Sequence, residues 1–357
     1  MIPGPVQLRP EVFEEMSRPM VPHYGTAWTA YYNETVDLLR RVFLTSGSIF
    51  PIPGSGNAGL DAAIGSSLDE EDRLLVLSNG HFGERVAEIG RSHYPDTAVL
   101  EVPVDRAISV DVLEQALSEN DGITAVGFVH SESSSGLLNP VRELVDACRV
   151  RGLLTIVDAI SSLGGAELRM DDWGIDVCIA ASQKCLEGPP GIGLVAVRDE
   201  AWARIRGKNG KGWYLNLQLW ADYAETWADG HPFPVTLAVP AFRALHRGLE
   251  AVLDEGMEHR WRRHLEMAAW ARKALAPGGY SAVFEPELAS PTILAMTPQE
   301  RLAVEEVVDR LRSEFKILIA RGMGAYKGRA FRVGIMGPQA TREELGVLVD
   351  ALLQIAS

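Results

Sequence analysis

Short apolar runs alternate with helical patterns over the first two thirds of the chain, and this alternation constrains the fold more than any other feature. The runs are continuous, without regular alternation of apolar and polar residues, which is typical of parallel strands covered by helices on both faces. The predicted strands are Leu74–Leu77, Thr97–Val102, Ala125–Val129, Leu153–Val157, Val177–Ala180 and Leu194–Val197. The sequence therefore predicts an α/β domain with a mostly parallel sheet.

The alternation of apolar runs and helical patterns stops after Trp220, where a loop at 229–234 leads into a long helical stretch at about 239–275. The elements predicted beyond it follow the order of a small α+β domain. They are strands at Ser281–Phe284, Thr292–Met296, Lys316–Ile319 and Phe331–Ile335, and helices around 299–314 and from Thr341. We therefore expect two domains, residues 1–245 and residues 246–357.

Charge and composition exclude several classes of function. The chain has 34 Lys and Arg residues against 48 Asp and Glu residues, a net charge of −14. Binding to nucleic acid requires clustered basic residues, so we expect no nucleic-acid partner. The three cysteines form no C-x-x-C pair, so neither a disulfide framework nor a metal site is expected. Without a secretory signal or an apolar stretch of about 18 residues, the sequence favours a cytoplasmic protein with no membrane contact.

Two polar side chains follow predicted strands. Asp158 comes directly after the strand at 153–157, and Lys184 follows the strand at 177–180. The carboxyl ends of parallel strands line the crevice in which such sheets bind ligands, so both side chains are expected in one site. A buried carboxylate facing an amine indicates pyridoxal phosphate, bound to the lysine as a Schiff base and held protonated at its ring nitrogen by the aspartate.

Each of these two residues has an ordinary alternative. A lone lysine after a strand is usually a surface residue, and a lone aspartate at a strand end is usually a helix cap. The segment that follows Lys184 favours the catalytic interpretation. Gly188-Pro189-Pro190-Gly191 is a rigid apolar loop that would exclude water and lower the pKa of the amine.

A glycine-rich segment, Gly54-Ser55-Gly56-Asn57-Ala58-Gly59, opens a predicted helix. Its backbone N–H groups and the helix dipole suit a phosphate. The segment also matches the dinucleotide fingerprint G-x-G-x-x-G, which requires an acidic residue at the end of the next strand. That strand ends in Ser78-Asn79. We therefore expect a single phosphate, and a nucleotide-binding oxidoreductase is the alternative from another class.

Several motifs, in the same order, make the chain resemble the class V aminotransferases, the alanine–glyoxylate and serine–pyruvate group of the fold type I pyridoxal phosphate enzymes. They are His130-Ser131-Glu132-Ser133-Ser134-Ser135-Gly136, Val157-Asp158-Ala159, Ser182-Gln183-Lys184, Pro189-Pro190-Gly191 and Phe331-Arg332-Val333-Gly334. The resemblance runs from Gly4-Pro5 nearly to the C-terminus. It implies a large domain with a mostly parallel seven-stranded sheet, a small C-terminal α+β domain, and a homodimer with the active site at the subunit interface.

The resemblance also implies roles for individual residues. Lys184 corresponds to the Schiff-base lysine that also moves the substrate proton, and Asp158 to the partner of the pyridine nitrogen. Further cofactor contacts are implied for Ser55, Gly56 and Asn57 at the phosphate, Gln183 beside the lysine, Phe82 stacked on the ring, Ser133 at the phenolic oxygen, and Thr236 from the other subunit. Substrate contacts are implied for Arg332 at the α-carboxylate and for Gly4 and Tyr24 in the N-terminal segment.

Some of these residues depart from the family pattern or have alternatives. Tyr24 stands near a position where many members carry a basic residue, and Phe233 replaces a Tyr whose hydroxyl reaches the phosphate. Phe82 could be core packing, Ser133 a turn residue and Arg332 a surface charge.

We therefore expect an aminotransferase that moves an amino group from a small amino acid, such as alanine or serine, to glyoxylate or pyruvate by a ping-pong mechanism. The planar fork of Arg332 suits bidentate binding of a carboxylate, which favours substrates that carry one. A lyase, a racemase, or a transaminase acting on an amine or on pyridoxamine remains an alternative on the same site.

Overall fold

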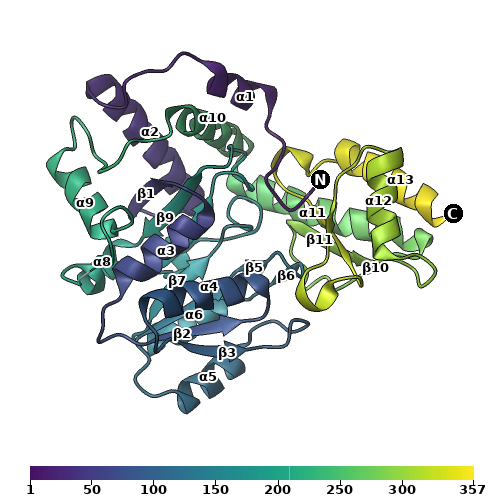
Figure 1. The fold of residues 1–357 in the computed structure, drawn as a ribbon, viewed down its shortest axis with the longest axis horizontal. Coiled ribbons are helices and arrows are strands. Elements are labelled where there is room, and N and C mark those ends of the chain that lie inside the picture. The colour runs from purple at the N-terminus through teal and green to yellow at the C-terminus, as the bar shows by residue number, and fades with distance from the viewer. Residues whose placement is uncertain (209) are drawn as a thin grey trace.

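The computed structural model describes residues 1–208 and 210–357, and it confirms the predicted α/β class. Its central sheet has seven strands in the order β1-β9-β8-β7-β4-β2-β3 (Figure 1). Their bounds are β1 (Ser48–Pro53), β2 (Leu74–Ser78), β3 (Ala98–Glu101), β4 (Ala125–Val129), β7 (Leu154–Asp158), β8 (Val177–Ala181) and β9 (Ile192–Val197). Strand β9 runs antiparallel to both of its neighbours, and the other pairings are parallel.

Strand β1 is missing from the prediction because its sequence, Ser48-Ile-Phe-Pro-Ile-Pro53, contains two prolines. Proline has no N–H for the ladder and is tolerated mainly at a sheet edge. Strand β1 lies at such an edge and pairs with β9 alone in the sheet.

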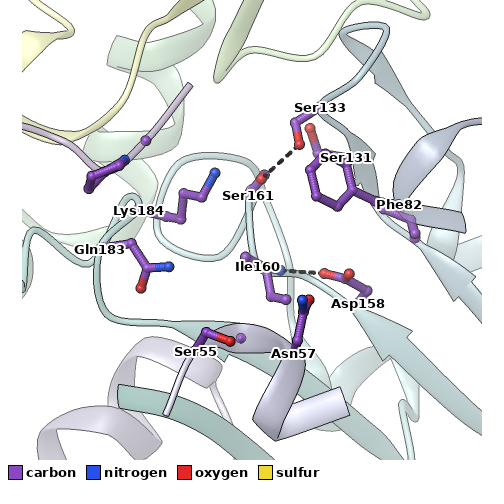
Figure 2. A pocket seen from close by; sticks show the side chains of 14 residues that line it. Ser55, Asn57, Phe82, Ser131, Ser133, Asp158, Ile160, Ser161, Gln183 and Lys184 are labelled. Carbon is purple, nitrogen blue, oxygen red and sulfur yellow. Dashed lines mark hydrogen bonds between the residues drawn. The ribbon is translucent and has the colours of Figure 1, made fainter. Parts of the chain in front are cut away.

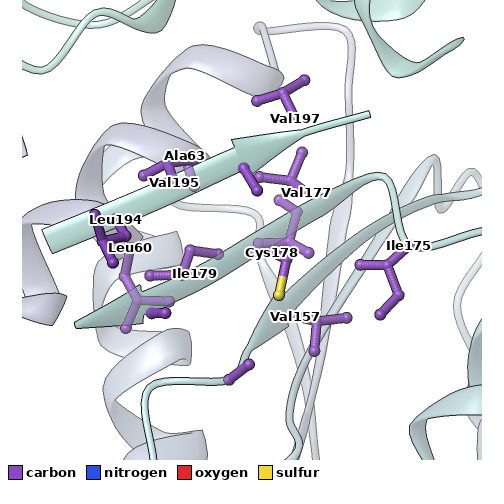
Figure 3. Close-up of a cluster of buried hydrophobic side chains, with 14 of the residues drawn as sticks. Leu60, Ala63, Val157, Ile175, Val177, Cys178, Ile179, Leu194, Val195 and Val197 are labelled. Carbon is purple, nitrogen blue, oxygen red and sulfur yellow. The ribbon is translucent and has the colours of Figure 1, made fainter. Parts of the chain in front are cut away.

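The strands in the middle of the sheet are buried along their whole length, because helices pack against them. The helices of this region are α1 (Pro10–Ser17), α2 (Thr26–Phe43), α3 (Gly56–Ser67), α4 (His81–His93), α5 (Val110–Glu119), α6 (Val141–Val150), α7 (Met170–Trp173), α8 (Asp199–Ile205) and α9 (Leu217–Thr226). A two-stranded ribbon, β5 (Ser131–Glu132) and β6 (Leu137–Leu138), follows β4. Figure 3 shows Leu60 and Ala63 of α3 beside Ile179 and Leu194 of the sheet, so α3 packs against the sheet through these side chains.

The predicted long helix at 239–275 is two helices, α10 (Val239–Glu255) and α11 (Met257–Leu275), separated by Gly256 at φ 82°. An antiparallel sheet in the order β10-β11-β13-β12 follows. The remaining elements are β10 (Ser281–Ala282), β11 (Ile293–Thr297), α12 (Val304–Glu314), β12 (Ala320–Arg321), β13 (Phe331–Gly334) and α13 (Arg342–Ala356). The strand predicted at 316–319 is wrong, because Lys316 adopts a left-handed conformation after α12 and pairing starts only at Ala320.

The buried apolar side chains form two main clusters. The larger surrounds the seven-stranded sheet and includes Phe242 and Val252 of α10. The second lies under the four-stranded sheet and includes Ala268 and Leu275 of α11. The division of the chain at residues 245 and 246 stays a prediction.

Within residues 1–208 and 210–357, no helix combines the length and the apolar character needed to cross a membrane. The cysteines Cys148, Cys178 and Cys185 are free thiols, and all three are buried.

Candidate active site

A cavity of about 240 Å³ lies where β4, β7 and β8 end, beside the N-terminus of α3 (Figure 2). Most of the residues predicted for the active site line it. They are Gly4, Ser55, Gly56, Asn57, Phe82, Ser133, Asp158, Gln183 and Lys184. The fold thus gathers six separate segments of the chain around one space, at the sheet edge where the sequence predicted a site.

Asp158 is the last residue of β7 and is buried in the wall of the cavity. Its Oδ1 accepts a hydrogen bond from the backbone N–H of Ile160 at 2.8 Å. Burial raises the pKa of the Asp158 carboxyl to about 7, and the nearby charge of Glu132 acts in the same direction. A positively charged N–H placed opposite this carboxylate would favour its ionised form.

Lys184 follows β8, and Figure 2 shows its amine directed into the cavity. Burial lowers the pKa of this amine. Its Nζ donates a short hydrogen bond to the carbonyl oxygen of Pro3. The next residue, Gly4, has φ 88°, and a Cβ there would lie 2.6 Å from Lys184 Cδ. The N-terminal segment therefore covers the lysine closely, and only glycine fits at position 4.

Helix α3 begins at the floor of the cavity, where Ser55 is its N-cap residue. The first N–H groups of a helix have no partner inside it, so those at Gly56 and Asn57 suit an anion. A Cβ on Gly56 would lie 2.5 Å from Ile160 Cδ1, so the helix approaches the loop after Asp158 closely. Gln183 Oε1 is buried without a hydrogen-bond partner among the described residues. Rotation of this amide can present either its oxygen or its N–H groups to the cavity.

The cavity has further lining residues that the sequence analysis missed. They are Pro5, Val129, Ser131, Ile160 and Ser161. Ile160 and Phe82 give the cavity apolar surface, and the Ser161 hydroxyl donates to the Ser133 hydroxyl at 3.3 Å. The position of Ile160 and Ser161 directly after Asp158 was the available signal for both.

Arg332 lies on β13, outside the lining but next to it. Its Nη1 donates to the carbonyl oxygen of Ser133 at 2.5 Å, and its Nε and Nη2 donate to that of Arg321 at 3.1 and 2.9 Å. The side chain is buried, and burial lowers the pKa of its guanidinium. Arg332 is therefore an oriented positive charge beside the cavity, rather than the surface charge considered as an alternative.

Thr236 and Tyr24 lie away from the cavity in the single chain. Thr236 is exposed, in a segment whose Phe233 is fully buried. Tyr24 is 62% exposed and borders a separate hollow with Trp28 and Tyr31. Their roles at the active site stay predictions, and that of Thr236 was predicted as a contact from the other subunit.

A comparison with known families gives the assignment. A family model described as aminotransferase class-V matches residues 14–351. The chain belongs to the class-V aminotransferases. It is 33% identical over 98% of its length to an uncharacterised aminotransferase of Methanocaldococcus jannaschii, covering 90% of that protein. It is 30% identical over 97% of its length to the (S)-ureidoglycine–glyoxylate transaminase of Bacillus subtilis, covering 87% of it.

Solved structures agree with this assignment. An alanine–glyoxylate aminotransferase of Nostoc sp. superposes with a TM-score of 0.94 at 28% identity, covering 100% of this chain and 94% of that one. The class-V aminotransferase therefore has the fold of the fold type I enzymes, and its cofactor is pyridoxal phosphate.

The residues of the cavity fit this cofactor. A helix N-terminus suits the phosphate, a buried carboxylate suits the protonated ring nitrogen, and a buried amine suits covalent attachment. In the part of the chain that the structure describes, no group of three or more His, Cys, Asp or Glu side chains could hold a metal ion.

Proposed function

We propose that this aminotransferase moves the amino group of a small amino acid to a small 2-oxo acid by a ping-pong mechanism. The observation that carries the proposal is the position of Arg332 beside a small cavity that holds both Lys184 and Asp158.

Pyridoxal phosphate supplies a carbonyl group that captures the substrate amine and a ring that accepts electrons from the substrate Cα. Ser55, Gly56, Asn57 and Gln183 would hold its phosphate. Asp158 would accept from the ring nitrogen, and the Ser133 hydroxyl would lie at the phenolic oxygen. Phe82 and Ile160 would provide the apolar surfaces that exclude water from the ring.

Lys184 would take the proton from the substrate Cα through Nζ and deliver it to the cofactor carbon C4′ in the same half-reaction, and the second half-reaction would reverse this transfer. A lowered pKa leaves more of the amine neutral at ordinary pH, and only the neutral amine acts as a base. The N-terminal segment supports this state because Pro3 and Gly4 exclude water from the amine.

Arg332 would bind the substrate carboxylate. Its guanidinium is already held by two backbone carbonyl oxygens, so little side-chain freedom is lost when a carboxylate binds. Relatives named for glyoxylate, the B. subtilis and Nostoc enzymes, support glyoxylate as the amino acceptor, with pyruvate as the second candidate.

We also propose a homodimer whose active sites lie at the subunit interface. Exposed apolar side chains gather near the N-terminus, at Phe13, Met20 and Tyr24. Burial in an interface would account for the exposure of these apolar side chains. Thr236 is exposed and available to a second subunit. Light scattering of the purified protein tests the dimer, and a monomer with full activity would contradict it.

The reaction itself is tested with the holoenzyme and single amino donors in the absence of an acceptor. Alanine or serine should convert the visible absorbance of the bound cofactor to that of pyridoxamine phosphate, and glyoxylate should reverse the change. Arg332→Met should raise the KM for the donor at least tenfold, whereas Arg329→Met, an exposed arginine nearby, should not. Racemisation or elimination without formation of pyridoxamine phosphate would show that the proposed reaction is wrong.

A further inference from the structure

Glu132, the second residue of β5, is a fully buried carboxylate beside the active site. Its oxygens accept hydrogen bonds from the backbone N–H of Phe82 at 3.2 and 3.3 Å, of Gly83 at 3.0 Å and of Ser134 at 3.1 Å. The Ser134 hydroxyl donates a further short bond. Across residues 1–208 and 210–357 it forms no ion pair, so these four donors are what stabilise its buried charge.

This carboxylate lies at the start of helix α4 and accepts hydrogen bonds from the N–H groups of its second and third residues, Phe82 and Gly83. The positive end of the helix dipole favours an anion at that position. Gly80 permits the approach, since a Cβ there would lie 2.6 Å from both Cγ and Cδ of Glu132. The helix start and the 131–134 segment are thereby held together through a single side chain.

The groups tied together by Glu132 belong to the cavity. The ring of Phe82 lines it, and the backbone of Phe82 donates directly to Glu132. Ser133, on the same segment as Glu132, also lines it and accepts a hydrogen bond from Arg332 through its carbonyl oxygen. Figure 2 shows the Phe82 ring next to Ser131 and Ser133.

We propose that Glu132 is a positioning residue, which holds the Phe82 ring and the Ser133 segment in the geometry that binds the cofactor ring. It acts through backbone donors and does not line the cavity itself. The inference rests on the cofactor placement proposed above. A carboxylate is required because it offers acceptors on both oxygens, whereas an amide would place N–H groups against the N–H donors of α4.

The test is a double-mutant cycle between Glu132→Gln and Phe82→Leu, measured as the affinity of the apoenzyme for pyridoxal phosphate. Phe82→Leu removes the aromatic contact and should weaken binding about tenfold. Glu132→Gln should weaken it to a similar or greater extent. Because Glu132 acts partly through Phe82, the loss of cofactor affinity in the double variant should be clearly smaller than the product of the fold-losses of the two single variants.

A control and a second variant keep this test decisive. Glu143→Gln removes an exposed carboxylate from the first turn of α6 and should leave cofactor affinity unchanged. If Glu132→Gln does not fold, Ser134→Ala replaces it, because it removes one donor to the same carboxylate and should show the same coupling at smaller size.

The outcomes separate the two proposals. If Phe82→Leu weakens cofactor binding and the effect of Glu132→Gln, or of Ser134→Ala in its place, simply multiplies with it, the positioning role is overturned while the cofactor placement stands. If Phe82→Leu leaves affinity unchanged, the cofactor placement fails and the inference fails with it. Reduced coupling in the double variant, together with an inert Glu143→Gln, supports the role of Glu132.

Discussion

The loop at 182–191, which connects β8 to β9 and carries Lys184, has regions of opposite electrostatic properties on its two sides. Behind the loop, Glu187 is fully buried and accepts from Arg9 Nε at 2.5 Å and from Arg260 Nη2 at 2.6 Å. Arg260 is also fully buried and donates to the carbonyl oxygens of Gly164 and Cys185, each at 2.7 Å. The charges in this region are compensated within the chain.

On the cavity side of the same loop, the charged groups are poorly compensated. Burial raises the pKa of Asp158 and lowers that of Lys184, so each charged form is disfavoured. Gln183 Oε1 has no partner among the described residues. Lys184 and Glu187 are only three positions apart, so burial alone does not mark a functional residue. What distinguishes the site is that its buried polar groups lack partners within the described residues, and a bound ligand would supply those partners.

The largest expected effect comes from removing the amine on the cavity side. Lys184→Ala should lower kcat by about 10⁴-fold, equivalent to about 5 kcal/mol, because the base and the point of cofactor attachment are lost together. Borohydride treatment followed by mass spectrometry should place a cofactor adduct on residue 184 of the native enzyme only. Stability should change little. If Lys184→Ala retained most of its activity, Lys184 would not be the catalytic base, and the assigned difference between the two sides of the loop would be wrong.

Removing a charge behind the loop should act on stability instead. Arg260→Met leaves Glu187 with one partner and two carbonyl oxygens without their donor, which should lower the free energy of unfolding by about 3–5 kcal/mol. Urea denaturation measures the loss. The matched control is Arg262→Met, an exposed arginine on the same helix, which should cost less than about 0.5 kcal/mol. Equal losses in the two variants would show that the buried network contributes nothing.

The sequence predicted one of these two regions and not the other. Asp158 and Lys184 were found because both follow apolar runs, and the ends of parallel strands meet at one edge of a sheet. Arg260 gave no signal, since it lies among several charged residues on a helix and its burial depends on packing between distant segments. Glu187 likewise gave no signal. Its backbone is left-handed, with φ 61°, a conformation that favours glycine and that a glutamate in the sequence does not indicate.

The fold shows the same limit. Strand Ala125–Val129 was predicted with its true bounds because it is apolar throughout. Strand β1 was missed because its prolines conceal it, and the break at Gly256 was missed because helical periodicity continues on both sides. Periodicity reports burial along one element, whereas edges, breaks and buried ion pairs are set by the neighbours of that element.

The Asp158 carboxyl allows a test of the comparison through pH. Its folded pKa, about 7, lies above the ordinary value of 3.8, so the unfolded chain releases this proton first as pH rises. The apoprotein should therefore lose stability between about pH 4 and pH 7, and Asp158→Asn should remove that loss. The difference between the two proteins should grow by on the order of 4 kcal/mol at most, measured by urea denaturation at several pH values.

Cofactor binding should reduce this slope, because the ring nitrogen offers the positive partner that the carboxylate lacks. Asp222→Asn, an exposed aspartate, serves as the control and should follow the native pH dependence. A native slope that Asp158→Asn leaves unchanged would mean that the group is already compensated in the apoprotein.

The smallest effect is expected at the outer edge of the compensated network. Arg9 is one-third exposed and is one of two arginines on Glu187, so Arg9→Gln leaves that carboxylate with Arg260. Solvent screening limits the loss of stability to about 1 kcal/mol, and 1 M salt should reduce it further. Arg9→Lys should recover most of the stability that Arg9→Gln loses, because lysine retains a positive charge near Glu187. If Arg9→Gln instead costs as much as Arg260→Met, the two arginines act as one unit, and the compensated region extends to the N-terminal segment over the active site.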